Sequence, residues 1–283
     1  MKIRDLSIQA LTQKAIQIKI SILEMLHTAK SGHLGGSIGV ADIFTALYFH
    51  LLHHNPNHPQ DKNRDRVILS AGHLAPVLYA SLAHAGYFEI AELQSLRKLG
   101  SRLQGHPALN NHLPGIETSS GSLGQGLSIA VGIALSAKYK KENYNIVTIL
   151  GDGELQEGSI WEAAMSATHY NLSNMIAIVD RNRVQIDGNT ENVMMLEPLA
   201  DKWKSFGWDV FECNGNNIEE FISTYKRTQQ STQKPKVIIA NTKMSFGIKS
   251  IEDDYTWHGK VPNKEQLAQF TKELISKNNI SNE

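Results

Sequence analysis

Apolar side chains recur at helical spacing near the start of the chain. Over residues 6–26 they alternate with polar positions as on one face of a helix, which predicts a helix that ends near Ser31 and Gly32. A second helix is expected over residues 40–51, where apolar side chains again predominate. A polar amphipathic helix is expected at residues 263–277, and the Asn- and Ser-rich residues after it should fray.

Four short aliphatic runs are typical of buried parallel strands, because turn or polar residues flank each of them. These runs lie at residues 67–69, 146–150, 175–179 and 237–240. Helical patterns lie between them at residues 122–139, 159–170 and 218–228. This alternation predicts an α/β fold, with a doubly wound, mainly parallel sheet flanked by helices.

The chain has 283 residues, a length that one large α/β domain or two smaller domains can fill. No repeat and no low-complexity linker divides it. We therefore expect one α/β domain over residues 1–262, followed by a C-terminal helix and a frayed tail at 263–283. Apolar residues make up 41% and charged residues 20%, which is typical of a folded globular protein.

The charge balance and the lengths of the apolar runs argue against nucleic-acid-binding and membrane proteins. Lys plus Arg and Asp plus Glu each number 28, so no overall basic field favours binding to nucleic acid or to an anionic membrane surface. No window approaches the roughly 18 apolar residues of a membrane-spanning helix, and charges break up any signal-peptide core, so a cytoplasmic protein is expected. The one cysteine, Cys213, is expected to be a buried structural thiol.

Candidate chemistry begins where the strand expected at 146–150 runs into the turn Gly151-Asp152-Gly153. In an open α/β sheet, ligands bind beyond the carboxyl ends of the strands, which is where Asp152 would lie. The two glycines would let the backbone come close to a phosphate. The next strand leads into Asn182, and parallel neighbours joined by one helix would bring Asn182 beside Asp152.

Hard oxygen ligands would converge at these two strand ends. A carboxylate from Asp152, an amide oxygen from Asn182 and a main-chain carbonyl near Val184 suit Mg2+ or Ca2+ better than Zn2+. Magnesium usually completes its coordination with phosphate oxygens and water, so the site implies a diphosphate cofactor. A Gly-Asp-Gly sequence alone is more often an ordinary turn, but the second ligand on the following strand end favours the functional interpretation.

The stretch 151–158, taken together with Asn182, resembles the thiamin diphosphate motif of the transketolase family. Further segments match that family in the same order, and together they cover nearly the whole chain. They are Ser31-Gly32-His33, Ser70-Ala71-Gly72-His73, Gly105-His106-Pro107 with Gly121-Ser122-Leu123-Gly124-Gln125-Gly126, and Trp257-His258-Gly259. The resemblance implies the diphosphate-binding domain of the thiamin diphosphate-binding fold.

The resemblance also implies roles for the matched residues. Asp152, Asn182 and the carbonyl of Val184 would hold Mg2+, for which Ca2+ or Mn2+ can substitute. Glu157 would belong to a carboxylate network at a subunit interface. The residues that would contact thiamin diphosphate are His33, His73, Gly121, Leu123, Asp152, Gly153, Asn182 and His258.

The implied reaction uses the cofactor for its most difficult step. The thiazolium ylide attacks a ketose carbonyl, and the ring takes up electrons as the adjacent carbon bond breaks. A two-carbon ketol unit then passes to an aldose, which is often phosphorylated. Among the catalytic residues implied, His33 and His258 would polarise or protonate the donor, and His106 would lie near the reacting hydroxyl. These histidines adjoin glycine, where a loop can present a side chain to a cleft.

A second group of histidines, His50, His53, His54 and His58, lies in a loop region with two prolines. No carboxylate or cysteine is spaced to complete a metal site with them. Structural or surface roles are therefore expected for this group.

The resemblance implies a partner subunit. In transketolases, the glutamate that contacts the pyrimidine ring and the arginines that bind substrate phosphate lie on a domain that follows this one. We therefore expect the N-terminal subunit of a split transketolase, active on sugar phosphates with a C-terminal partner subunit in a two-plus-two heterotetramer. The small residues along 122–139 would allow close approach either to that partner or to the chain's own sheet.

Other functions compete with this interpretation. A 1-deoxyxylulose-5-phosphate synthase or a dehydrogenase E1 subunit would share Asp152 and Asn182, but the histidine set and residues 155–158 favour transketolase. Residues 34–36 stand where full-length transketolases usually place proline, as in split subunits, which leaves sugar specificity open. A non-catalytic regulatory or scaffold protein is the alternative from a different class, and the retained ligand and histidine set argues against it.

Overall fold

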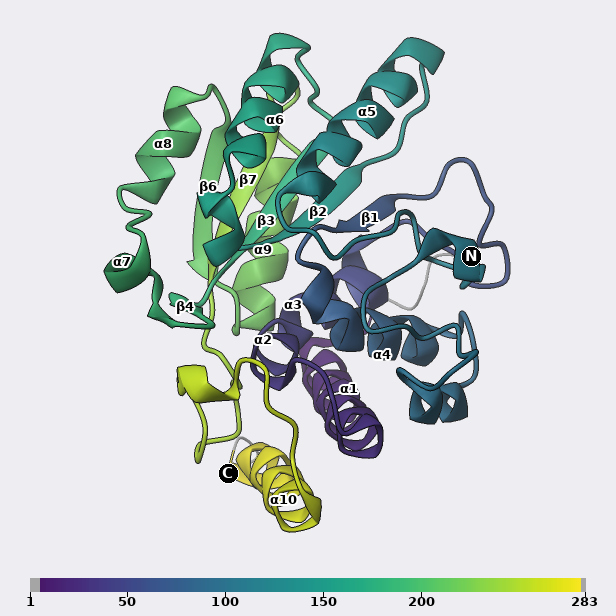
Figure 1. Ribbon diagram of the computed structural model, residues 1–283. Helices are drawn as coiled ribbons and strands as arrows, with labels where there is room; N and C mark the ends of the chain where they lie inside the picture. The colour runs from purple at the N-terminus through teal and green to yellow at the C-terminus, as the bar shows by residue number, and fades with distance from the viewer. Residues whose placement is uncertain (1–5, 281–283) are drawn as a thin grey trace.

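The computed structural model describes the backbone of residues 6–280 and the side chains of residues 6–276. Within this part of the chain, five strands form one fully parallel sheet in the order β1-β2-β3-β7-β6 (Figure 1). The strands are β1 (Arg66–Leu69), β2 (Ile146–Gly151), β3 (Met175–Arg181), β6 (Asp209–Asn214) and β7 (Lys236–Asn241). The parallel α/β architecture expected from the sequence is confirmed.

The strand order shows why the sheet is doubly wound. The chain adds β1, β2 and β3 side by side, passes over one position to β6, and returns with β7 between β3 and β6. The outward crossover carries α8 (Leu199–Ser205), and the return carries α9 (Ile218–Thr228). Because crossovers between parallel strands are right-handed, reversing the direction of travel places these two helices on opposite faces.

Side chains on each strand alternate between two cores, one on each face of the sheet. On β2, Val147 and Ile149 face one core, whereas Ile146 and Leu150 face the other. The first core packs against α1 (Ile8–Ala29), α2 (Leu34–Gly39), α3 (Ala41–Ala46), α4 (Ala75–Ala85) and α9. The second packs against α5 (Gln125–Lys140), α6 (Gly158–His169) and α8. Strands buried on both faces explain the continuous aliphatic runs in the sequence.

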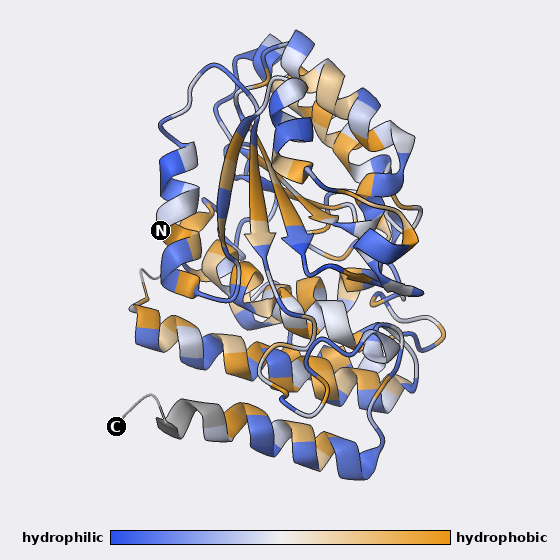
Figure 2. Ribbon diagram, turned by 90° about the vertical axis from the view of Figure 1, so that its left-hand side faces the viewer, coloured by the Kyte–Doolittle hydropathy of each residue, from blue (hydrophilic) through white to orange (hydrophobic). Residues whose placement is uncertain are grey.

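The C-terminal helix α10 (Lys264–Ile280) runs beside α1 in the layer farthest from the sheet (Figure 2). Phe270 and Leu274 of α10 are buried in the same core as the apolar face of α1. Residues 278–280, which were expected to fray, instead continue α10, and the rest of the expected tail, residues 281–283, lies outside the described residues. The division into a domain at 1–262 and a separate tail stays a prediction.

The structure tests the bounds of two predicted helices. The helix expected at 40–51 is found over residues 41–51, where α3 continues directly into a π-helical turn at Leu47–Leu51, and Val40 separates it from α2. The helix expected to begin at residue 122 starts only at Gln125. Gly124 precedes it with a φ of 81°, a left-handed conformation that a helix cannot contain.

Two of the larger elements not predicted from the sequence are β6 and α4. β6 is an edge strand that mixes apolar and polar residues and is mostly only half-buried or exposed, so it lacks the aliphatic run of the other strands. α4 is buried along almost its entire length, so it shows no polar stripe to mark a helical period. Cys213, at the end of β6, is buried as expected. No helix in the described range 6–280 has the length and apolar character needed to span a membrane.

Several short elements connect the larger ones. β4 (Val184–Gln185) and β5 (Gly188–Asn189) form a small antiparallel ladder just after β3, and α7 (Thr190–Val193) follows it. The short 3-10 helices are Gly72–Leu74, Ile90–Ser95, Leu109–Asn111, Gly153–Gln156 and Tyr255–Trp257.

Candidate active site

A cavity of about 330 Å³ lies at the carboxyl ends of β1, β2 and β3. It brings together segments that are far apart in the sequence. The residues proposed from the sequence that line it are His33, His73, His106, Gly121, Leu123, Asp152, Gly153, Asn182, Val184 and His258. Glu157 does not line the cavity, because it is exposed at the start of α6. Its predicted interface role stays a prediction.

Close packing between two loops forms one wall of the cavity. A Cβ atom on Gly72 would lie only 2.6 Å from the main-chain nitrogen of Gly121, so a side chain at position 72 would force the loops apart. Gly72 precedes His73 at the end of β1, and Gly121 packs against the ring of His106. The glycine at position 72 therefore allows His73 and His106 to reach the same cavity.

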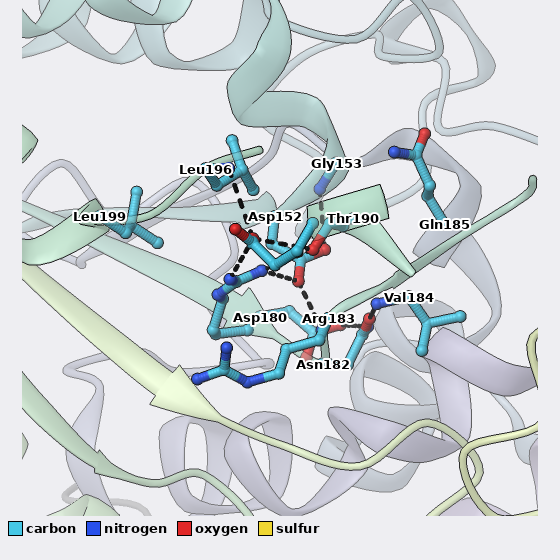
Figure 3. Close-up of polar contacts among 12 residues, drawn as sticks. Asp152, Gly153, Asp180, Asn182, Arg183, Val184, Gln185, Thr190, Leu196 and Leu199 are labelled. Atoms are coloured by element: carbon cyan, nitrogen blue, oxygen red, sulfur yellow. Dashed lines mark hydrogen bonds and ion pairs between the residues drawn. The ribbon is translucent and has the colours of Figure 1, made fainter. Parts of the chain in front are cut away.

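Asp152 is the buried carboxylate at the end of β2, with 2% of its surface exposed. Its Oδ1 accepts the N–H of Gly153 at 2.8 Å, and its Oδ2 accepts the N–H of Arg183 at 2.6 Å (Figure 3). Nη1 of Arg181 also donates to Oδ2, at 3.1 Å. Burial raises the pKa of Asp152, and the guanidinium of Arg181 acts against that rise.

Asn182 is oriented by its neighbours on the next strand end. Its Nδ2 donates to Asp180 at 2.8 Å, and its Oδ1 accepts the N–H of Val184 at 2.9 Å (Figure 3). Asp180 also accepts a hydrogen bond from Thr242. Burial raises the pKa of Asp180 to about 7, and the charge of Asp152 adds to the rise. The predicted pair Asp152 and Asn182 thus lies in one hydrogen-bonded unit.

Glu154 is a buried carboxylate in the same turn whose role was not evident from the sequence. It accepts the N–H of Gly124 at 2.9 Å and the N–H of Gly151 at 3.0 Å, and the hydroxyl of Ser70 also donates to it. These contacts tie the ends of β1 and β2 to the start of α5. A carboxylate directly after the Gly-Asp-Gly turn was the only indication in the sequence.

Three imidazoles form a triangle at the opposite side of the cavity. The ring centroids are 5.4 Å apart for His33 and His73, 5.7 Å for His33 and His258, and 5.3 Å for His73 and His258. These residues come from three different loops, after α1, after β1 and after the turn at Tyr255–Trp257. The sequence places them far apart, and only the fold makes them neighbours.

Burial sets the protonation of this triangle. It lowers the pKa of His33 to about 4 and the pKa of His73 to about 3, and neighbouring imidazoles lower both further. Burial also lowers the pKa of His258. The pKa of His106 is lowered by burial and then by the charge of Arg97. Near pH 7 these rings are therefore neutral, and each can both donate and accept a hydrogen bond.

One ring nitrogen in the triangle is both buried and without a partner among the described residues. It is Nδ1 of His33. Buried polar atoms without a partner are rare in folded proteins, and ligands are one of the groups that satisfy them. This nitrogen is therefore a candidate contact for a ligand in the cavity.

The second histidine group lies elsewhere in the fold. His54 is buried with Nδ1 2.9 Å from the Tyr87 hydroxyl and Nε2 2.8 Å from the carbonyl oxygen of Tyr48. His53 and His58 are exposed. Across residues 6–280, no group of three or more His, Cys, Asp or Glu side chains is arranged to hold a metal ion. The ligand set predicted from the sequence is of another kind, with one carboxylate, one amide and one main-chain carbonyl, and it stays a prediction.

The cavity residues fit a diphosphate bound through a divalent cation. Oδ1 of Asp152 accepts one hydrogen bond, whereas Oδ2 accepts two, so Oδ1 keeps a lone pair for a hard cation. The oxygen of Asn182 likewise accepts one hydrogen bond. Neutral histidines can donate to phosphate oxygens or sugar hydroxyls.

All the comparisons with known proteins identify the same family. Residues 11–279 match the family described as transketolase, thiamine diphosphate binding domain. The chain is 41% identical over 253 residues to one subunit of the apulose-4-phosphate transketolase of Phocaeicola vulgatus, covering 89% of each chain. It is 40% identical over 264 residues to the 6-deoxy-6-sulfo-D-fructose transketolase subunit SqwG of Clostridium sp., covering 93% of this chain and 96% of that one.

Longer proteins match over a part of their length. Human transketolase is 37% identical over 270 residues, which is 95% of this chain but 42% of the human protein. The fold matches the crystal structure of transketolase from Campylobacter jejuni with a TM-score of 0.88 and 32% identity. That match covers 97% of this chain and 43% of the Campylobacter chain.

Proposed function

The chain belongs to the transketolase family, and from this membership we propose that it is the thiamin diphosphate-binding subunit of a split transketolase. With a partner subunit, it transfers a two-carbon ketol unit from a ketose phosphate to an aldose. The observation that carries the proposal is the cavity itself, where the residues singled out by the motifs meet around histidines whose lowered pKa keeps them neutral.

The comparison of lengths supports a separate partner. The chain spans nearly the whole of two relatives named as transketolase subunits, but only 42% of human transketolase. We propose that a C-terminal subunit supplies the rest of the active site and that the assembly is a heterotetramer with two copies of each chain. Native mass spectrometry of the co-purified complex tests this stoichiometry.

Only some of the small residues of α5 are available to form that interface. Ala130, Ala134 and Ala137 are buried in the core beneath the helix, so packing against the chain's own sheet accounts for them. A Cβ on Gly132 would meet no atom within 4 Å, and Tyr139 is 89% exposed. The outer face of α5 therefore remains available to a partner.

The names of the relatives narrow the substrate class. One acts on apulose 4-phosphate and the other on 6-deoxy-6-sulfo-D-fructose, according to their names. Both are ketoses with an anionic group. We propose that this chain serves a ketose of the same class, carrying a phosphate or a sulfonate.

Different residues of the cavity would bind the metal ion and the cofactor. When bound, thiamin diphosphate supplies a nucleophilic carbon and an electron sink. Asp152, Asn182 and the carbonyl of Val184 hold Mg2+ and through it the diphosphate. Gly153, Gly121 and Leu123 line the cofactor pocket, as their position on the cavity wall permits.

The histidines handle hydroxyl groups and protons. His73, with a pKa of about 3, stays neutral and can donate a hydrogen bond to the diphosphate. His33, through its unpaired Nδ1, and His258 orient and polarise the donor sugar. His106 accepts or returns a proton at the reacting hydroxyl. These roles require neutral rings at the working pH, in agreement with the direction of every pKa shift in the group.

A ketol-transfer assay tests the proposal. Xylulose 5-phosphate and ribose 5-phosphate are supplied with thiamin diphosphate and Mg2+, first to this chain alone and then to the chain with its co-purified partner. Activity is expected only in the second mixture. A sulfonated ketose donor is tested in parallel. Absence of transfer from all donors, with both chains folded and associated, would contradict the proposal and favour a non-catalytic role.

A further inference from the structure

Arg181 is a buried arginine at the end of β3, with 1% of its side chain exposed. Its guanidinium donates four hydrogen bonds. Nη1 contacts Oδ2 of Asp152 at 3.1 Å and the hydroxyl of Thr190 at 2.8 Å. Nη2 contacts Glu191 at 2.7 Å and Glu197 at 2.9 Å. A charged group this deeply buried needs partners, and here every partner is anionic or a hydrogen-bond acceptor.

The two terminal nitrogens of the guanidinium bind partners in different places. The inner nitrogen faces the carboxylate of the cavity, whereas the outer nitrogen faces two glutamates near the surface, with 26% and 44% of their side chains exposed. A guanidinium is planar and presents its donors in fixed directions. Glu191 and Glu197, by holding the outer nitrogen, therefore set the direction in which the inner nitrogen points at Asp152.

This direction matters for the geometry of Asp152. Arg181 and the main-chain N–H of Arg183 both donate to Oδ2, whereas Oδ1 accepts only the N–H of Gly153. Two donors on one oxygen define the plane of the carboxylate. Oδ1 is then the oxygen left to bind a cation.

The charges of the cluster also favour a cation. A lone arginine beside Asp152 would cancel the carboxylate and repel Mg2+. Glu191 and Glu197 more than offset that guanidinium, since Arg181 pairs with three carboxylates in all. The side chain of Arg183 approaches Glu197 at 3.5 Å but is half exposed, so solvent weakens its effect.

We propose that Arg181 is a positioning residue for the cation ligand Asp152, and that Glu191 and Glu197 act through it. The inference rests on the proposed function, since it assigns the second layer of contacts around the proposed Mg2+ site. Contacts of this kind typically change metal affinity by about 10- to 100-fold when removed.

Mn2+ binding tests the proposal without using activity. Free Mn2+ is measured by electron paramagnetic resonance in titrations of the complex of both subunits with thiamin diphosphate. Arg181→Met is expected to weaken Mn2+ binding by about 10- to 100-fold, with kcat at saturating Mn2+ changed much less. Arg181→Lys keeps the charge without the planar fork, so it should recover only part of the loss. Complete recovery in Arg181→Lys would overturn a positioning role.

A second variant avoids the risk that loss of a buried arginine prevents folding. The double substitution Glu191→Gln with Glu197→Gln alters only partly exposed side chains. About threefold or greater weakening of Mn2+ binding is expected, and a thermal melt on the same sample checks that the complex is folded at the temperature of the titration. Arg102→Met is the matched control, because Arg102 forms a two-bonded ion pair with Glu92 that does not line the cavity. It should leave Mn2+ binding unchanged.

The outcomes separate failure of the inference from failure of the proposed function. If the wild-type complex binds Mn2+ and the glutamate double variant binds it equally well, Arg181 does not position Asp152 through these residues. If the wild-type complex binds no Mn2+ in the presence of thiamin diphosphate, the proposed function itself fails, and the inference with it.

Discussion

Two histidines whose pKa is lowered by burial, the buried His54 and the half-buried His33, differ in what their ring nitrogens contact. Both ring nitrogens of His54 have protein partners, the Tyr87 hydroxyl and the carbonyl of Tyr48. Nδ1 of His33 has none among the described residues, and its ring lies instead against two other imidazoles. Burial lowers the pKa of both residues, so the direction of titration does not distinguish them.

The difference shows which property separates a structural histidine from a candidate functional one. A buried histidine with both nitrogens satisfied stabilises the fold, because removing it leaves its partners unpaired. A half-buried histidine whose buried nitrogen is unsatisfied beside a cavity contributes little to stability in that state and can take up a ligand. The direction of the pKa shift alone would have grouped the two residues together.

The largest expected effect is on turnover in His33→Ala. We expect kcat/KM of the two-subunit enzyme to fall by about 100-fold or more, since a group that handles protons at the reacting sugar typically contributes that much. The unfolding temperature should stay close to that of the wild type, because no protein partner loses its hydrogen bond. Steady-state kinetics and thermal melts on the same preparation check both. An unaltered kcat/KM would remove His33 from the catalytic set.

His54→Ala should show the opposite pattern. The substitution leaves the Tyr87 hydroxyl and the Tyr48 carbonyl without their partner, and we expect a loss of about 1–3 kcal/mol in the free energy of unfolding. The activity of the folded complex should be unchanged. Urea titration measures the stability, and His58→Ala, at an exposed position of the same loop region, is the control. Lower activity per folded complex would place the two histidine groups in one functional class.

The smallest expected effect is on the pH dependence of stability. The pKa of His33 is about 4 in the folded chain, below its ordinary value of 6.5. As pH falls from 6.5 towards 4, the unfolded chain binds a proton that the native chain does not, so this contribution to stability is present above pH 6.5 and is lost as pH falls through 4. His33→Ala should therefore lose less stability than the wild type between pH 7.5 and 5.

Urea titrations at pH 7.5 and 5, without cofactor, measure this difference. His58→Ala again serves as a control that should follow the wild type. Identical losses in the wild type and in His33→Ala would show that burial does not keep His33 neutral. The lowered pKa would then no longer be a property that His33 shares with His54.

The sequence supported the fold class because its cues are local. Buried parallel strands leave aliphatic runs, and the covering helices leave periodic patterns between them. α4 and β6 departed from these cues, since a helix buried almost throughout lacks a polar stripe and an edge strand lacks an aliphatic run. The start of α5 shifted to Gln125 because the conformation of Gly124 is not visible as a hydrophobic pattern.

The candidate site could be anticipated where one rule connects sequence to position. Ligands gather beyond the carboxyl ends of parallel strands, so Asp152 and Asn182, after successive strands, were expected to be neighbours. Arg181 carried no comparable cue. Its partners lie in the turn after β2 and in the segment that follows β5, and no spacing rule relates these segments to the end of β3.

The sequence by itself determined the alternation of buried strands with covering helices, the motifs at the strand ends and the membership of a family. The tertiary structure alone decided that His33, His73 and His258 form one triangle, that Nδ1 of His33 lacks a partner, and that Arg181 reaches Asp152. The physical reason is the distance along the sequence over which each property is decided. Backbone periodicity reflects neighbours a few residues apart, whereas the direction and partners of a buried polar side chain depend on segments that only the packed fold brings together.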